Sequence, residues 1–95
     1  MRRFIRLSNG TELPASSCGE NSGSLWIHVR ATMHEAYEAF GFPENLGLIE
    51  DITEEDGQEL RRVEWEGYTE LTNLTVRAGE IQVGLTRGGD AHDNH

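Results

Sequence analysis

The sequence predicts a small α+β fold, in which a mainly antiparallel β-sheet or sandwich of about six strands packs against one short α-helix. Three observations predict it. Apolar and polar residues alternate in several short segments, which is typical of half-buried strands. The pairs Asn9-Gly10 and Asp56-Gly57 lie between such segments, where they suit tight hairpin turns. Residues 33–40 show the helical period instead, so one helix is expected among the strands.

The N-terminal segments favour a hairpin followed by a loop. Residues 3–7 alternate charged and apolar side chains and are predicted to be the first strand. Asn9-Gly10 predicts a two-residue type I′ turn, because both positions tolerate positive φ. A short return strand at residues 11–13 is expected to end at Pro14. The polar stretch 16–24 is rich in turn formers and predicts a loop.

Residues 25–30 alternate most cleanly and predict the next strand. Leu25, Ile27 and Val29 would share one face of it, since successive side chains of a strand point to opposite faces. Trp26 would lie on the other face. It is therefore either part of a two-sided sheet or a surface aromatic residue.

The helix is predicted at residues 33–40 from its end signals. Thr32 and Glu35 match a capping box, in which two side chains bond the free backbone N–H groups of a helix start. Gly41 is placed to cap the C-terminus, and Pro43 prevents continuation. The expected apolar face consists of Met33, Ala36, Tyr37 and Phe40.

The second half of the chain predicts further strands at residues 46–52, 58–66, 68–77 and 80–86. Asp56-Gly57 and Ala78-Gly79 are the tight turns between them, and a bulge is expected near Asn73, where the alternation changes parity. Residues 1–87 are thus predicted to be a single compact domain. The polar residues 88–95 lack periodicity and are expected to be a disordered tail.

Composition bears on disulfide bonds, targeting segments and cellular location. The chain has 95 residues and one cysteine, Cys18, so it forms no intrachain disulfide. Cys18 lies in a polar stretch, where an exposed thiol is expected. The basic N-terminus lacks the apolar run of a signal peptide, and no segment approaches the roughly 20 apolar residues of a membrane span. The expected location is the cytoplasm.

No motif of a metal site or of catalysis stands out. The acidic segment 50–57 fails the EF-hand pattern, because placing Gly57 at the sixth position puts Ile52 at the first, where it cannot bind a metal. An acidic hairpin turn is the simpler interpretation. The histidines and the many carboxylates have no spacing that singles out an acid, a base or a nucleophile. We therefore expect neither an enzyme nor a bound metal or cofactor.

Negative charge is concentrated in the middle of the chain. The formal net charge is −9, and residues 35–70 hold twelve acidic residues against two arginines. Such a charge opposes contact with nucleic acid or anionic lipid and favours basic protein surfaces. In a strand, Glu64 and Glu66 would project from one face about 6.6 Å apart, close to the spacing of phosphates along one nucleic-acid strand. The alternative is an ordinary solvated acidic face that favours solubility.

The predicted partner-binding surface consists of the acidic residues Glu35, Glu38, Glu50, Asp51, Glu54, Glu55, Asp56, Glu59, Glu64, Glu66 and Glu70.

The segment 65–69, Trp-Glu-Gly-Tyr-Thr, follows an acidic hairpin and precedes a Leu-Thr strand. Together with Asn9-Gly10-Thr11 and the segment 41–45, Gly-Phe-Pro-Glu-Asn, it resembles a group of small phage and prophage proteins over most of residues 4–86. The motifs of this resemblance are structural and imply no catalytic residue. Gly67 is expected to allow close backbone approach while Trp65 and Tyr68 pack.

In size and charge the chain also resembles anti-CRISPR proteins that mimic nucleic acids. The two likenesses imply a phage-derived, nonenzymatic inhibitor in the host bacterial cytoplasm. Its carboxylates would bind a basic, DNA-binding host protein such as a CRISPR effector complex, with no direct contact to nucleic acid or membrane. The alternative is a phage head or tail protein whose strands form an oligomeric sandwich. A monomer or small homo-oligomer would favour the inhibitor.

Overall fold

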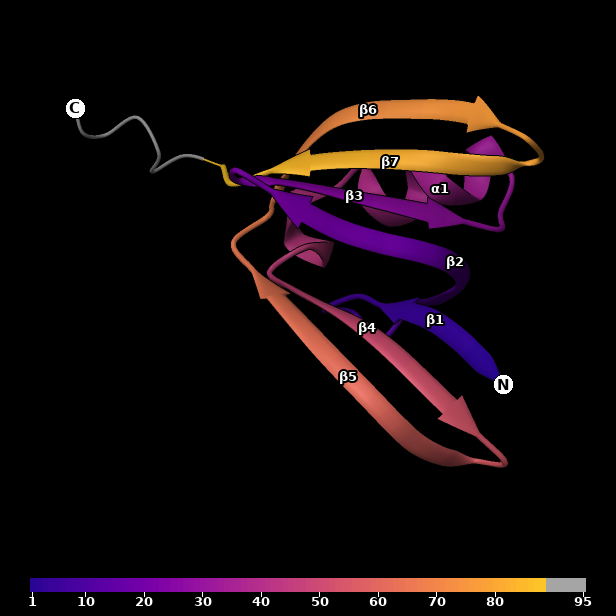
Figure 1. Ribbon diagram of the computed structural model, residues 1–95. Helices are drawn as coiled ribbons and strands as arrows, with labels where there is room; N and C mark the ends of the chain where they lie inside the picture. Colours follow the sequence, from indigo (N-terminus) through magenta and orange to yellow (C-terminus); the bar gives the residue numbers. More distant parts are fainter. Residues whose placement is uncertain (89–95) are drawn as a thin grey trace.

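The computed structural model describes residues 1–88 and confirms the predicted α+β class, with seven strands and one α-helix (Figure 1). In chain order the elements are β1 Arg2–Arg6, β2 Glu12–Asn21, β3 Ser24–Val29, α1 Met33–Phe40, the 3₁₀ turn η1 Pro43–Asn45, β4 Leu48–Glu55, β5 Gln58–Glu66, β6 Glu70–Arg77 and β7 Glu80–Thr86. Of the predicted disordered tail, Gly88 donates a backbone hydrogen bond to Gly67 at 3.4 Å. Residues 89–95 lie outside the described part of the chain.

The strands form one antiparallel sheet in the order β5-β4-β1-β2-β3-β7-β6. Strand β2 joins its two halves: the residues up to Pro14 pair with β1, and those from Ala15 pair with β3, with a register shift between Ala15 and Ser17. The change of partner bends the sheet. Figure 1 shows β4 and β5 running away from β3, β7 and β6.

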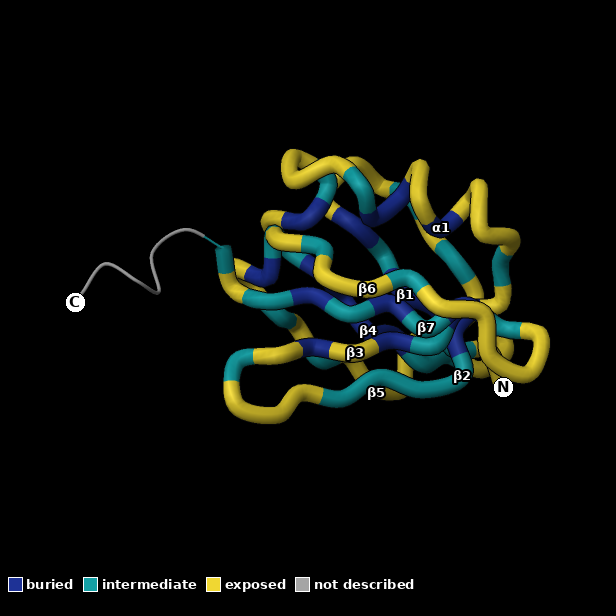
Figure 2. Tube along the Cα trace, turned by 90° about the horizontal axis from the view of Figure 1, so that it is seen from above, coloured by how far each residue is buried: buried dark blue, intermediate teal, exposed yellow. Residues whose placement is uncertain are grey.

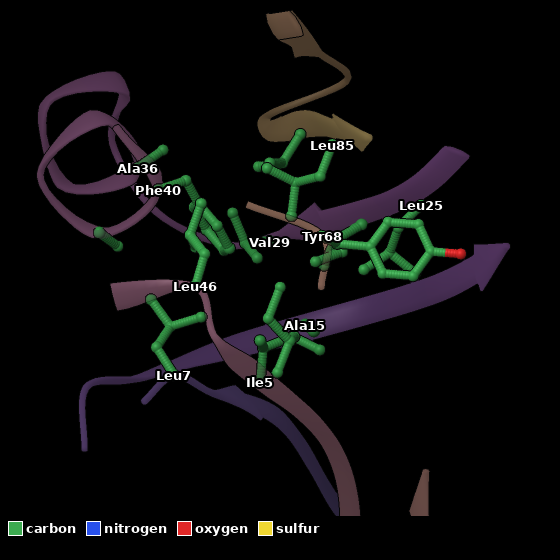
Figure 3. Packing of buried hydrophobic residues seen from close by; sticks show 14 of the residues in the cluster. Ile5, Leu7, Ala15, Leu25, Val29, Ala36, Phe40, Leu46, Tyr68 and Leu85 are labelled. Atoms are coloured by element: carbon green, nitrogen blue, oxygen red, sulfur yellow. The ribbon is translucent and has the colours of Figure 1, made fainter. Parts of the chain in front are cut away.

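The core lies on the face of the sheet that α1 covers, and the helix contacts β6 and β7 (Figure 2). Phe40 and Leu46 point toward Val29 of the sheet, and all three are fully buried (Figure 3). Tyr68 is also fully buried, and its ring contacts Trp65 edge-to-face with centroids 6.4 Å apart. The aromatic residues of segment 65–69 therefore pack as predicted. Tyr68 belongs to the hydrophobic core, and Trp65 packs against it.

Strand β2 corrects two predictions. It runs through Pro14 and continues over the stretch 16–21, which was predicted to be a loop. Pro14 is tolerated because the ladder needs only its carbonyl, which accepts from the Arg30 N–H at 2.8 Å. The polar stretch forms a strand because it pairs with β3. Most of its residues are half-exposed, so they do not show the alternation of apolar and polar residues by which strands were predicted.

The turns are partly as predicted. Asp56-Gly57 and Ala78-Gly79 have positive φ at both positions, as type I′ turns require. At Asn9-Gly10 only Gly10 has positive φ, at +89°, so the predicted type I′ turn is wrong. The Gly10 N–H bonds the Leu7 carbonyl and the Leu7 N–H bonds the Thr11 carbonyl, both at 2.9 Å. This is a three-residue loop ending in a glycine bulge.

The helix has the predicted bounds and the predicted capping box. Thr32 Oγ1 accepts from the Glu35 N–H at 3.0 Å, and Glu35 Oε1 accepts from the Thr32 N–H at 2.9 Å. The buried face of the helix differs from the predicted one. Ala36, Ala39 and Phe40 are buried, whereas Met33 and Tyr37 are 40% and 51% exposed. The sheet contacts the helix along the 36–39–40 stripe, which leaves these two side chains at its flank.

The bulge predicted in β6 is present, whereas Gly67 has a different role from the predicted one. A register shift between Leu71 and Asn73 confirms the bulge expected in β6. Gly67 does not serve close approach, because a side chain built there would meet nothing within 4 Å. Its φ of +84° instead explains why glycine stands between β5 and Tyr68.

Candidate functional site

The β4–β5 hairpin forms one edge of the sheet and carries most of the predicted acidic surface. Strand β5 pairs with β4 alone among the described strands, and the two diverge from the helix-covered half (Figure 1). The predicted residues on this hairpin are Glu50, Asp51, Glu54, Glu55, Asp56, Glu59, Glu64 and Glu66. The hairpin is therefore the element that could present negative charge to a partner.

Asp51 is not part of an exposed acidic surface, contrary to the prediction. Its side chain is 5% exposed and binds the guanidinium of Arg3 through both oxygens, at 3.0 and 2.9 Å. Arg3 also donates to the Ser16 carbonyl at 3.1 Å. A buried charge needs such partners, so the role of Asp51 is to join β4 to β1 and β2.

The prediction that Glu50 belongs to the exposed acidic surface is also wrong. It is 8% exposed, and its carboxylate pairs with Arg62 of β5 and lies 3.5 Å from Arg6 of β1. It points to the face of the sheet opposite the core, which we call the outer face. Glu64 is its neighbour across the ladder, so Arg62 separates two carboxylates that would otherwise repel each other.

A network of ion pairs covers the outer face at β1, β4 and β5. It joins Arg2, Arg6 and Arg62 to Glu12, Glu50, Glu54, Glu59 and Glu64. Beneath it, Phe4 and Ile52 are almost fully buried, although they lie outside the main core, and the Arg2 guanidinium lies 4.1 Å from the Phe4 ring centroid. The arginines thus shield apolar side chains and offset part of the acidic charge.

Arg62 is the centre of this network. Its hydrogen bonds hold the pKa of Glu59 below the usual value, and Glu59 in turn is the largest cause of the raised pKa of Arg62. Both groups are charged at neutral pH. Glu59 is exposed, but its charge is offset by this pair, with 2.6 Å between Arg62 Nη2 and Glu59 Oε1.

Four acidic residues of the hairpin remain exposed with little or no neutralisation, and we call Glu55, Asp56, Glu64 and Glu66 the hairpin carboxylates. Glu64 and Glu66 lie on one face of β5, and the nearest cation to Glu64 is Arg62 at 4.0 Å. Within residues 1–88, Glu55, Asp56 and Glu66 have no ion pair within 4.0 Å. Glu55 and Asp56 lie at the tip, beside a shallow depression of about 300 Å³.

The other predicted residues lie elsewhere. Glu35 and Glu38 are on α1, which contacts β6 and β7 at the opposite end of the strand order, and Glu70 begins β6. One oxygen of Glu35 is engaged in the capping box. Glu35 and Glu38 line a groove of about 410 Å³ between α1 and the β1–β2 loop. The structure therefore divides the predicted surface instead of bringing it together.

Three further observations concern metal ligands, the thiol and membrane spans in the described part of the chain. Residues 1–88 contain no group of three or more His, Cys, Asp or Glu side chains that could hold a metal ion. Cys18 is half-buried, contrary to the expected exposed thiol, and burial raises its pKa to about 12. At neutral pH it is therefore a thiol, which is a poor nucleophile. No helix within this range is both long and apolar enough to cross a membrane.

The sequence interpretation missed the arginines. Arg2 and Arg6 alternate with Phe4 on β1, and this spacing placed them on one face of a strand. This alternation can be recognised in the sequence, but it does not reveal that β1 pairs with the acidic strand β4.

Comparison of the chain with protein-family models, curated proteins and solved structures gave no match. The resemblance to phage proteins stays a prediction.

Proposed function

We propose that the protein is a nonenzymatic inhibitor whose β4–β5 hairpin binds a basic, nucleic-acid-binding surface of another protein. The observation that carries this proposal is the position of Glu64 and Glu66. Both are exposed on one face of an edge strand, and β5 has no strand beyond it within residues 1–88. A partner could approach them without displacing any described element.

The spacing of these carboxylates supports mimicry of a phosphate backbone. Side chains two residues apart on a strand lie about 6.6 Å apart, and a nucleic-acid strand carries its charges at similarly dense intervals. Glu55 and Asp56 extend the negative charge to the hairpin tip. Lys and Arg side chains that normally bind phosphates would form ion pairs with them, and such association is fast and weakens with salt.

The first partner to test is a CRISPR effector complex, as the small size and negative charge suggest. A gel-shift assay with purified effector complex and target DNA should show less DNA bound as the protein is added. Glu64→Gln/Glu66→Gln should inhibit less at equal concentration. Glu38→Gln/Glu44→Gln, which removes the same charge from α1 and η1, is the matched control and should inhibit like the wild type. Unchanged DNA binding with every effector tested would refute this choice of partner.

A virion assembly protein is the second candidate. The exposed apolar side chains Leu60 on β5 and Val76 on β6 favour it, since they are 53% and 62% exposed and lie on the two edge strands. Free sheet edges with apolar residues can pair with further copies of a chain. Size-exclusion chromatography with light scattering decides between the two: a ring or large oligomer supports assembly, and a monomer or dimer supports the inhibitor.

A further inference from the structure

The outer face of β3 carries an indole that lies flat on the sheet. Trp26 has a glycine opposite it on both neighbouring strands, Gly19 of β2 and Gly84 of β7. A side chain built at Gly19 would place its Cβ 2.5 Å from Trp26 Cζ2, so the indole covers this glycine. Trp26 is nevertheless 38% exposed. One face of the ring rests on the backbone, and the other is open to solvent.

An ordered row of polar groups lies beside this ring. The His28 ring centroid is 5.4 Å from that of Trp26, and its Nδ1 lies 2.7 Å from Ser17 Oγ. On its other side, His28 Nε2 lies 3.4 Å from Gln82 Oε1, which also accepts from Arg77 at 3.1 Å. Because a carbonyl oxygen only accepts, the neutral imidazole would carry its proton on Nε2, and Ser17 would then donate to Nδ1. The amide nitrogen of Gln82 keeps two N–H donors without a partner in residues 1–88.

One ion pair and one further arginine lie around this platform. Arg30 and Glu80 form an ion pair at 3.4 Å, and Ser16 donates to Glu80 at 2.9 Å. The Arg77 guanidinium is hydrogen-bonded to Gln82. Arg77 has no ion pair within residues 1–88, but it is one guanidinium bound to a neutral amide, and the net charge of −9 repels anions such as phosphate. The platform therefore suits a neutral ligand that has a flat apolar face and hydroxyl groups.

We propose that this platform binds a neutral carbohydrate, with a pyranose ring stacked on Trp26 and its hydroxyls bound to the Gln82 amide and Ser17. The C–H face of a pyranose is apolar and matches the exposed indole, while its rim hydroxyls match the donors and acceptors beside it. The surface is flat, so binding is weak, with a Kd of the order of 1 mM. The proposal is independent of the acidic hairpin, which uses other residues.

The test is an NMR titration of the ¹⁵N-labelled protein with cellohexaose, maltohexaose and chitohexaose, each up to about 10 mM. The expected result is a saturable shift of the Trp26 indole N–H and of the Gln82 side-chain amide with one of them, while the Trp65 indole stays in place. No saturable shift with any of the three overturns the proposal. Hexathymidylate is titrated in parallel, and a preference for it over the sugars overturns the proposal in favour of nucleic acid. Concentration-dependent shifts without any ligand overturn it in favour of self-association.

Variants separate binding from folding. Trp26→Ala should abolish the shifts, and Trp26→Phe should retain part of them because a flat ring remains. Gln82→Ala should weaken sugar binding about fivefold. If Trp26→Ala does not fold, the affinity of Gln82→Ala for the sugar tests the proposal instead. Leu60→Ala on the distant hairpin should bind as the wild type does. Full binding by both Trp26→Ala and Gln82→Ala contradicts the proposal. Glu64→Gln/Glu66→Gln should keep sugar binding, which separates this test from that of the inhibitor.

Discussion

Arg3 of β1 and Asp51 of β4 form a two-point ion pair across the joint of the sheet. The Arg3 Nε and Nη2 atoms lie 3.0 and 2.9 Å from the two oxygens of Asp51, and Nη1 donates to the Ser16 carbonyl. Ser16 lies in the register shift where β2 leaves β1 for β3. One guanidinium thus links three strands at the position where the sheet bends.

We predict that Arg3→Met destabilises the protein by about 3 kcal/mol, because it leaves the Asp51 carboxylate buried and unpaired. Urea unfolding measures this value. Arg3→Met combined with Asp51→Leu should recover part of the loss, since no charge is then left without a partner. Arg2→Met on the same strand is the control and should change stability little, because its ion pairs are exposed. Equal effects of Arg3→Met and Arg2→Met would contradict the structural role of the pair.

The hydroxyl of the buried Tyr68 donates to Glu20 Oε2 at 2.6 Å, and this bond is the main cause of the lowered pKa of Glu20 in the folded protein. A lowered pKa stabilises the fold above the unfolded value of 4.5, and the contribution is lost as the pH falls through the folded value. Tyr68→Phe should therefore be less stable than the wild type near pH 7, with a smaller difference at about pH 3. Urea unfolding at both pH values measures it; a difference independent of pH contradicts the account.

Thr32→Ala should destabilise the protein by about 1 kcal/mol, since it removes the cap of α1. Glu35→Ala should cost less, because it removes the other half of the capping box. Glu38→Ala, on the same helix but outside the cap, is the control. The midpoints of urea unfolding followed by circular dichroism rank the three variants. A Glu38→Ala loss as large as that of Thr32→Ala would contradict the capping argument.

Gly19→Ala should destabilise the protein and displace the Trp26 indole, because the new Cβ would lie 2.5 Å from Cζ2. Gly47→Ala is a matched control, since its Cβ would meet only Ser8 Oγ at 3.4 Å, an ordinary contact. Thermal unfolding gives the stability, and the chemical shift of the Trp26 indole N–H reports its displacement. An unmoved indole signal in Gly19→Ala would show that the ring does not lie over this glycine.

Local signals account for the parts of the fold that the sequence predicted. Thr32 and Glu35 act on the helix start within three residues, and Asp56-Gly57 sets its own turn, so both could be recognised without knowledge of the rest. The alternation of residues 80–86 was equally clear, because Ile81, Val83 and Leu85 face the core. These features depend on neighbours in the chain.

The errors concern features that depend on distant strands. Strand β2 crosses Pro14 because β1 and β3 hold it on either side, and no local pattern reports that pairing. The exposure of Glu50 and Asp51 was misjudged because their arginine partners lie on other strands. These partners are Arg3 and Arg6 on β1 and Arg62 on β5. The sequence alone could locate the acidic segment, but only the register of the sheet separates its buried carboxylates from its exposed ones.

The central claim is that the exposed carboxylates of β5 bind a basic, nucleic-acid-binding surface. The most direct measurement is the affinity of immobilised CRISPR effector complex for the wild type, Glu64→Gln/Glu66→Gln and Glu38→Gln/Glu44→Gln at low and high salt. We predict that wild-type binding weakens with salt, that the β5 variant binds about tenfold more weakly at low salt, and that the α1–η1 variant binds as the wild type does. No wild-type binding at low salt, or equal affinities of the wild type and the β5 variant, would contradict the account.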